Sequence, residues 1–302
     1  MHMEFVRRSL PLAVLAALFA ACTSDSGGAG TLRVELNGEE ASREGFPVGE
    51  GEDQIAFADG YTVQFDRVLV SFASFELRGA DGEVASLSAD PIVVDLHTGT
   101  PEAWVFEDVP ARRWEDVRYT YAAPTAETRA VGAIAQADID AMIQNGYAML
   151  VSGTAMSSDA QAYPFELGFE FVVDNTRCVS GTDETDGLVI PNGAVVDSEL
   201  TIHFDHLWFD TYAFDDAELR FEAWAAVAPA NGPITLDTLA QQSLSDLRDR
   251  QGMPIERDGT PLVYNPGPLN LAANNLREYT VAAATTTGHF NGEGHCDYTL
   301  RQ

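Results

Sequence analysis

Residues 61–77, YTVQFDRVLVSFASFEL, alternate apolar and polar side chains over most of their length. Side chains of a β-strand point to opposite faces in turn, so this alternation is typical of a long strand with one buried face. Ala80-Asp81-Gly82 follows and supplies a hairpin turn signal. The apolar positions are Tyr61, Val63, Phe65, Val68, Val70, Phe72, Phe75 and Leu77.

Shorter stretches of the same character surround this segment and predict the fold class. They span residues 32–36, 92–96, 104–106, 117–121, 147–154, 165–173 and 195–209. Regular short strands with turns between them favour a mainly β protein, an antiparallel β-sandwich of immunoglobulin-like kind, over residues 32–210. A helical pattern interrupts it near residues 126–144 and ends at Asn145-Gly146, which predicts a helical insertion.

Beyond Asp210 the pattern is mainly helical. We expect helices over residues 217–227, 236–248 and 269–284, so that residues 211–302 form a helical segment and a histidine- and glycine-containing tail packed on the sandwich. The loop 229–235 between the first two resembles an EF-hand. If Gly232 is aligned with the loop glycine, Asn231 is the only competent side-chain ligand, so we expect no calcium there.

The N-terminus has the three parts of a bacterial lipoprotein signal peptide. Arg7 and Arg8 precede an apolar run at 10–19, and Ala20-Ala21-Cys22 offers the cleavage site. We predict that residues 1–21 are removed, that Cys22 carries the lipid, and that residues 22–31 form a flexible tether. Ordinary cleavage, with Cys22 left as a thiol, is the alternative.

Lipid attachment would place the chain in the cell envelope, facing the periplasm or the cell exterior, with the membrane as its first partner. In this oxidising compartment Cys178 and Cys296 are expected to form a disulfide. A pair of thiolate metal ligands is the alternative.

Composition excludes several classes of function. The formal net charge is −30, and all 17 basic residues are arginine. Such acidity argues against nucleic acid as a partner, because phosphates would be repelled. The chain has no serine-nucleophile elbow, zinc-protease helix, phosphate loop or dinucleotide fingerprint. Without lysine there is no Schiff-base chemistry, and we predict no enzymatic activity.

Four histidines fall into two short clusters, and these are the candidate metal ligands. His203, Asp205 and His206 lie in one, and His289, Glu293 and His295 precede Cys296 in the other. A Cys178–Cys296 link would draw the second cluster to the sheet that carries the first. Imidazoles and carboxylates together suit copper or zinc.

One geometric objection applies to the first cluster. On an unbroken strand His203 and His206 point to opposite faces, so both can ligate one ion only if the strand ends or bulges between them. The competing hypothesis is a non-enzymatic interaction module in which buried histidines hydrogen-bond acidic neighbours.

Residues 55–121 resemble the N-terminal strands of the MbnP-like family, periplasmic proteins associated with methanobactin operons. The resemblance rests on residues 59–71, on Phe75-Glu76-Leu77, on the Asp81-Gly82 turn and on Val93-Val94-Asp95-Leu96. It implies a β-rich fold, copper binding through histidine, and a periplasmic redox partner that oxidises a tryptophan. The histidine clusters lie outside the matched stretch, so no ligand is carried over. Trp208, next to the first cluster, is the tryptophan to examine first.

Overall fold

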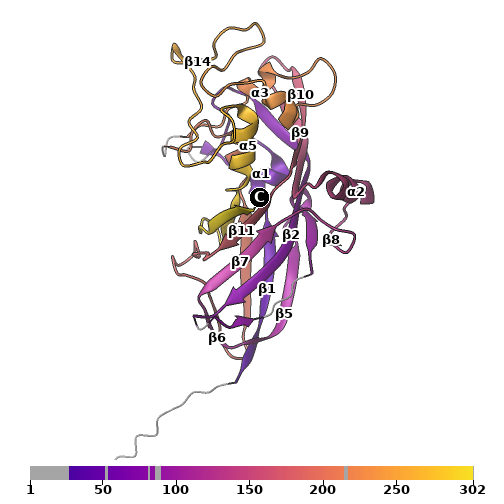
Figure 1. The fold of residues 1–302 in the computed structure, drawn as a ribbon, viewed down its shortest axis with the longest axis vertical. Helices are drawn as coiled ribbons and strands as arrows, with labels where there is room; N and C mark the ends of the chain where they lie inside the picture. Colours follow the sequence, from indigo (N-terminus) through magenta and orange to yellow (C-terminus); the bar gives the residue numbers. More distant parts are fainter. Residues whose placement is uncertain (1–26, 52–53, 81, 86–89, 214–216, 302) are drawn as a thin grey trace, which may run out of the picture.

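The computed structural model describes residues 27–51, 54–80, 82–85, 90–213 and 217–301. Over these residues the protein is mainly β, with a few short helices. Figure 1 shows an elongated body, with β1, β5 and β6 reaching one end and α3, β10 and β14 at the other. The predicted signal peptide, Cys22 and the first part of the tether lie outside the described residues. No helix in the described part of the chain is long and apolar enough to span a membrane.

The elements follow one another in an order dominated by strands. The strands of the first half are β1 (Ala29–Asn37), β2 (Thr62–Arg78), β3 (Val84–Ala85), β4 (Ile92–Asp95), β5 (Glu102–Pro110), β6 (Arg112–Trp114), β7 (Asp116–Tyr121), β8 (Arg129–Val131) and β9 (Met149–Met156). Those of the second half are β10 (Ala162–Phe169), β11 (Val172–Thr176), β12 (Leu188–Ile190), β13 (Val195–Ile202), β14 (Glu256–Arg257), β15 (Thr260–Pro261), β16 (Gly288–Phe290) and β17 (Asp297–Arg301).

The helices are short and lie between the strands. They are α1 (Glu39–Glu44), α2 (Gln136–Asn145), α3 (Glu222–Ala226), α4 (Leu236–Leu239) and α5 (Leu276–Ala284), with 3-10 turns η2 (Leu96–Thr98) and η3 (Phe204–Trp208).

Two sheets carry most of the strands. The smaller has the order β16-β13-β1-β5, and the larger has β10-β9-β2-β7-β11-β17, with β3 and β4 also paired with β2, and β8 paired with β4. The 17-residue β2 is the strand that the alternating stretch predicts. It pairs with β9 along its first part and with β7 along its second. Bulges near Phe65 and Phe72 shift the register, which lets one strand serve both partners.

Both sheets and the segment after residue 210 contribute to one hydrophobic core. Trp208 illustrates this, because it is fully buried and its indole ring lies 5.8, 5.9 and 5.7 Å from the rings of Phe46, Phe65 and Trp224. These residues come from four separate parts of the chain, so the core ties the first and last thirds of the protein together.

The strand pairing corrects the expectation of a purely antiparallel fold. β1 runs parallel to β13, and β4 runs parallel to β8. The segment 165–173 is divided between β10 and β11, and the strand predicted over 195–209 ends at Ile202. The first strand begins at Ala29, inside the predicted tether of residues 22–31.

The predicted helices form in the expected places, but each is shorter than predicted. The insertion near 126–144 contains β8 and then α2, which ends at Asn145 with Gly146 in the left-handed conformation. Among the described residues after Asp210, three short helices form, β16 adds to the smaller sheet and β17 adds to the larger one. The EF-hand-like stretch contains α3 and α4, each of five residues or fewer.

Candidate metal centre

The end of β13 brings His203 and His206 to the same side of the chain. β13 stops at Ile202, His203 occupies the position before η3, and His206 lies in η3 three residues later. His203 is still extended, and the chain turns directly after it, so the alternation of an unbroken strand does not continue to His206. Their ring centroids are 5.8 Å apart. The objection drawn from an unbroken strand therefore does not apply, because β13 ends at Ile202, before both histidines.

β16 places His289 beside His203. In the antiparallel β13–β16 pair, Thr201 lies opposite His289, and His203 is two residues further along the same face. Diagonal neighbours on one face are within reach of ring side chains. The His203 and His289 ring centroids are 4.3 Å apart, and His206 lies 5.4 Å from His289. Gly288, next to His289, allows β16 to pack against β7, because a Cβ there would lie 2.3 Å from the Tyr121 hydroxyl.

The disulfide holds the tail against this pair of strands. Cys178 and Cys296 are bridged across 118 residues, and the Val179 backbone N–H donates to the His295 carbonyl at 2.8 Å. The His295 ring, which is exposed, lies 5.2 Å from His289. Three of the four imidazoles predicted to converge, those of His203, His206 and His289, therefore lie together, and the fourth, His295, lies beside His289 at the edge of this group and belongs to neither set of possible ligands described below.

Glu39 is a member of the site that the sequence pattern did not reveal. Asn37 of β1 is in register with Thr201 of the parallel strand β13, so Glu39 and His203 both lie two residues beyond that level. The Glu39 Oε2 is 3.5 Å from His203 Nδ1. Glu39 has a φ of 59°, an uncommon value for a non-glycine residue, and its N–H donates to Asn37 Oδ1 at 2.7 Å. The parallel register of β1 and β13 brings Glu39 to the site, and the sequence pattern does not reveal that register.

The side chains form two sets of three that could each hold an ion. His203, His289 and Glu293 make the first set, and His203, Asp205 and His206 make the second. Within each set the ligand atoms lie within 4.8 Å of one another. His203 belongs to both sets.

Two buried ring nitrogens of the site have no hydrogen-bond partner. They are His203 Nε2 and His289 Nδ1, on residues that are only 6% and 5% exposed. Buried polar atoms are nearly always paired, so each such atom calls for an explanation. His206 differs, because its Nδ1 lies 3.1 Å from Thr286 Oγ1 and so has a hydrogen-bond partner.

Burial sets the protonation of the cluster. It lowers the pKa of His206 to about 3, with added repulsion from His289 and His203, and lowers that of His289 to about 4, with repulsion from His203. Both imidazoles are neutral near pH 7, the form that binds metals. Burial also raises the pKa of Asp205 and of Glu39, and His203 opposes this increase in each case.

Protein-family models, curated proteins and solved structures were compared with the chain, and none matches it. These comparisons do not bear on the resemblance to the MbnP-like family, which stays a proposal.

Two further residues, the histidine His97, which lies outside both clusters, and Trp208, are held by contacts of the fold. His97 binds the Ser42 carbonyl through Nδ1 at 2.9 Å and belongs to neither set of ligands. Trp208 is fully buried in the aromatic core.

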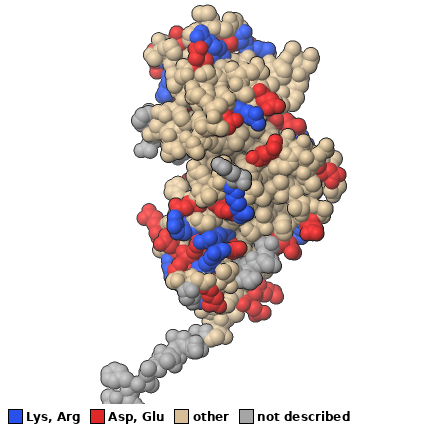
Figure 2. All heavy atoms as spheres, viewed as in Figure 1, with Lys and Arg blue, Asp and Glu red and all other residues tan. Residues whose placement is uncertain are grey.

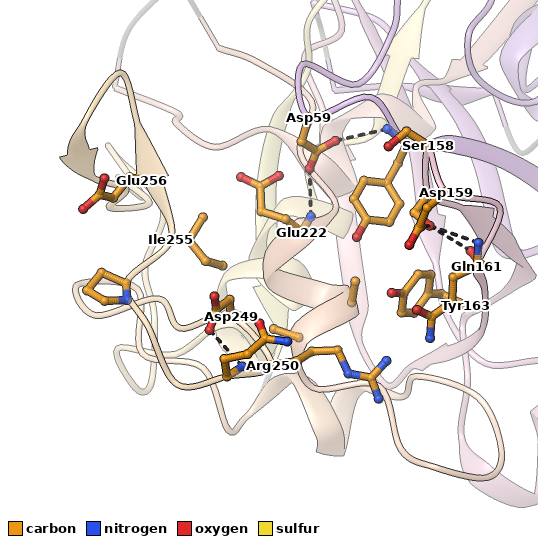
Figure 3. Close-up of a pocket in the computed structure, with 16 residues that line it drawn as sticks. Asp59, Ser158, Asp159, Gln161, Tyr163, Glu222, Asp249, Arg250, Ile255 and Glu256 are labelled. Carbon is orange, nitrogen blue, oxygen red and sulfur yellow. Dashed lines mark hydrogen bonds between the residues drawn. The ribbon is translucent and has the colours of Figure 1, made fainter.

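A separate cavity of about 710 Å³ lies beside α3 (Figure 3). Its lining includes Tyr163, Arg250 and several carboxylates, among them Asp59 and Glu222, and none of the residues of the metal centre. Asp59 there accepts the backbone N–H groups of Phe221 and Glu222 at the start of α3, which is a structural task. On the face that Figure 2 shows, carboxylates gather in several groups with arginines among them.

Proposed function

We propose that the protein is a non-enzymatic lipoprotein of the cell envelope that binds a transition metal, copper or zinc, through His203, His206, His289 and His295. Asp205 and Glu293 assist them. One observation carries the proposal: histidines from two segments more than 80 residues apart converge, with two buried ring nitrogens left without a partner. An ion would satisfy both nitrogens.

The donor set favours a metal of borderline character. Imidazole suits copper and zinc, a carboxylate can complete the shell, and no thiolate is available because both cysteines of the folded body are bridged. The resemblance to the MbnP-like family points to copper. It also points to a periplasmic redox partner, and such a partner would have to act at a distance on Trp208, because that ring is buried.

The direct test is metal content. The protein, purified without a histidine tag, should retain copper or zinc after dialysis, as measured by mass spectrometry of the metal. The double variant His203→Ala/His206→Ala should lose it, whereas His97→Gln, which removes a histidine outside the cluster, should keep it. Equal metal in the double variant and the parent protein would refute the proposal.

The second candidate is an envelope interaction module whose histidines are structural. The His206–Thr286 hydrogen bond and the burial of His203 favour it. It predicts that the parent protein carries no stoichiometric metal and that the double variant unfolds at a lower temperature. Metal content of the parent protein therefore separates the two candidates before any variant is made.

Attachment through Cys22 and the sandwich architecture belong to the same proposal. Mass spectrometry of the membrane-bound protein would detect the lipid on Cys22, and Cys22→Ala should release the protein from the membrane. The two large sheets that share one core support a sandwich, with the parallel β1–β13 pair as a departure from a simple immunoglobulin-like pattern.

A further inference from the structure

We infer that the centre holds two divalent ions, with the His203 ring bridging them through its two nitrogens. This inference rests on the proposed function and goes further, because it assigns a second ion and adds Glu39 as a ligand. The first ion lies on the Nε2 side of His203, with His289 and Glu293. The second lies on the Nδ1 side, with Glu39, Asp205 and His206.

The distances around His203 are those of ligands that share an ion. Nδ1 is 3.5 Å from Glu39 Oε2, and Nε2 is 3.9 Å from Glu293 Oε1. Hydrogen bonds of this kind are about 2.7–3.2 Å long. Two donors that each lie about 2.1 Å from one tetrahedral ion are separated by about 3.4 Å. Each nitrogen therefore faces its own carboxylate across a gap that suits an ion better than a proton.

The number of donors exceeds what one ion takes up. Three imidazoles, those of His203, His206 and His289, lie together, and the carboxylates of Glu39, Asp205 and Glu293 are close enough to repel one another. A zinc or copper site in a protein uses about four or five ligands. The donors also separate into two sets that have only His203 in common. One ion would leave several of them without a role.

Binding of ions on both sides of the ring would release the one ring proton of the neutral His203 imidazole to the solvent.

Copper(II) is the probe for this inference. The full chain without a histidine tag is loaded with Cu²⁺, dialysed, and analysed for bound copper and for its electron paramagnetic resonance signal. Two copper ions per chain are expected, with a double-integrated signal far below the bound copper, because an imidazolate bridge couples the two unpaired spins antiferromagnetically.

Matched variants test the assignment of the two sides. Glu39→Gln and Glu293→Gln are nearly isosteric, and each should reduce the bound copper to one ion per chain and restore the full signal of that ion. His203→Ala should abolish the coupling, and His97→Gln should change neither copper content nor signal.

Each outcome bears on one of the two proposals. One copper ion per parent chain, or two with full uncoupled signal, would overturn the bridged pair and leave the proposed function in place. Absence of bound copper and zinc from the parent chain would overturn both proposals.

Discussion

At the scale of single residues, Asp59 joins distant parts of the fold. Its Oδ2 accepts the N–H groups of Phe221 and Glu222 at 2.6 and 2.8 Å, so a loop before β2 caps α3 from more than 160 residues away. Burial raises the pKa of Asp59 from 3.8 to about 6 in spite of these bonds. The ionised form is therefore costly in the folded protein.

The variant Asp59→Asn should remove that cost and keep an acceptor for both N–H groups. Between pH 3.8 and 6 the folded parent protein binds a proton that the unfolded chain does not, so the contribution of Asp59 to stability falls as the pH rises through this window. The free energy of unfolding of the variant minus that of the parent should thus be more positive at pH 7 than at pH 4, by up to about 3 kcal/mol.

Urea denaturation at the two pH values measures this difference. Asp66→Asn, on the exposed side of β2, controls for the loss of one negative charge. If the free energy of unfolding of Asp59→Asn differs from that of the parent by the same amount at both pH values, burial does not raise the pKa of Asp59.

The ligand residues differ in how far the sequence could reveal them. His203, His206, His289 and His295 stand out because histidine is scarce in this chain and the four are clustered. Glu39 does not stand out among 47 acidic residues. It reaches His203 only through the parallel register of β1 and β13, and an alternating pattern carries no information on strand direction.

At the scale of elements, the long strands were predictable and the helices less so. The alternation in residues 61–77 specifies β2, because a strand with one buried face needs that pattern. Leu236, Leu239, Leu244 and Leu247 have helical spacing and are buried, yet α4 ends at Leu239.

Gln242 explains the early end of α4. Its side-chain amide donates to the carbonyls of Ala223 and Arg248, and its Oε1 accepts from the Arg248 N–H. Of these backbone groups, the Arg248 N–H is one that a helix over residues 236–248 would have paired, and Gln242 satisfies it while the leucines reach the core from an irregular segment. Such long-range hydrogen bonds leave no periodic trace in the sequence.

The disulfide anchors, through Cys296, the segment that carries His289 and His295. Replacing both cysteines, Cys178→Ala/Cys296→Ala, removes a link across 118 residues, which chain entropy values at up to about 5 kcal/mol. We expect a clear decrease in unfolding temperature by calorimetry. Metal affinity should weaken as well, because the segment with His289 and His295 is then held only at its two ends, by the three-residue pairing of β16 with β13 and the five-residue pairing of β17 with β11.

A control variant separates these two effects. Arg33→Ala breaks an exposed ion pair with Asp197, which is worth at most about 1 kcal/mol, and leaves the tail in place. An unchanged metal affinity in the cysteine variant would mean that strand pairing alone positions the histidines.

At the scale of the whole molecule, the net charge of −30 makes any cation a potential stabiliser through screening. A specific site adds a larger effect, since an ion that binds only the folded state stabilises it by about 2.7 kcal/mol at 100 times its dissociation constant. We expect Zn²⁺ to raise the unfolding temperature of the metal-free protein, and a chelator to reverse the increase.

Mg²⁺ at the same concentration distinguishes the specific effect from screening. It prefers oxygen ligands and should produce only a small increase. Glu39→Gln and Glu293→Gln should each reduce the increase that Zn²⁺ causes. Equal increases with Zn²⁺ and Mg²⁺ would point to general charge neutralisation.

β13 pairs with β1 on one side and with β16 on the other, and this arrangement also determines at what stage of synthesis the candidate centre can form. Its candidate donors lie at positions 39, 203–206 and 289–293, so a nascent polypeptide that has not yet emerged beyond residue 293 lacks part of them. Under the proposed function, metal would therefore bind only late in biogenesis, after all three segments have been synthesised and paired.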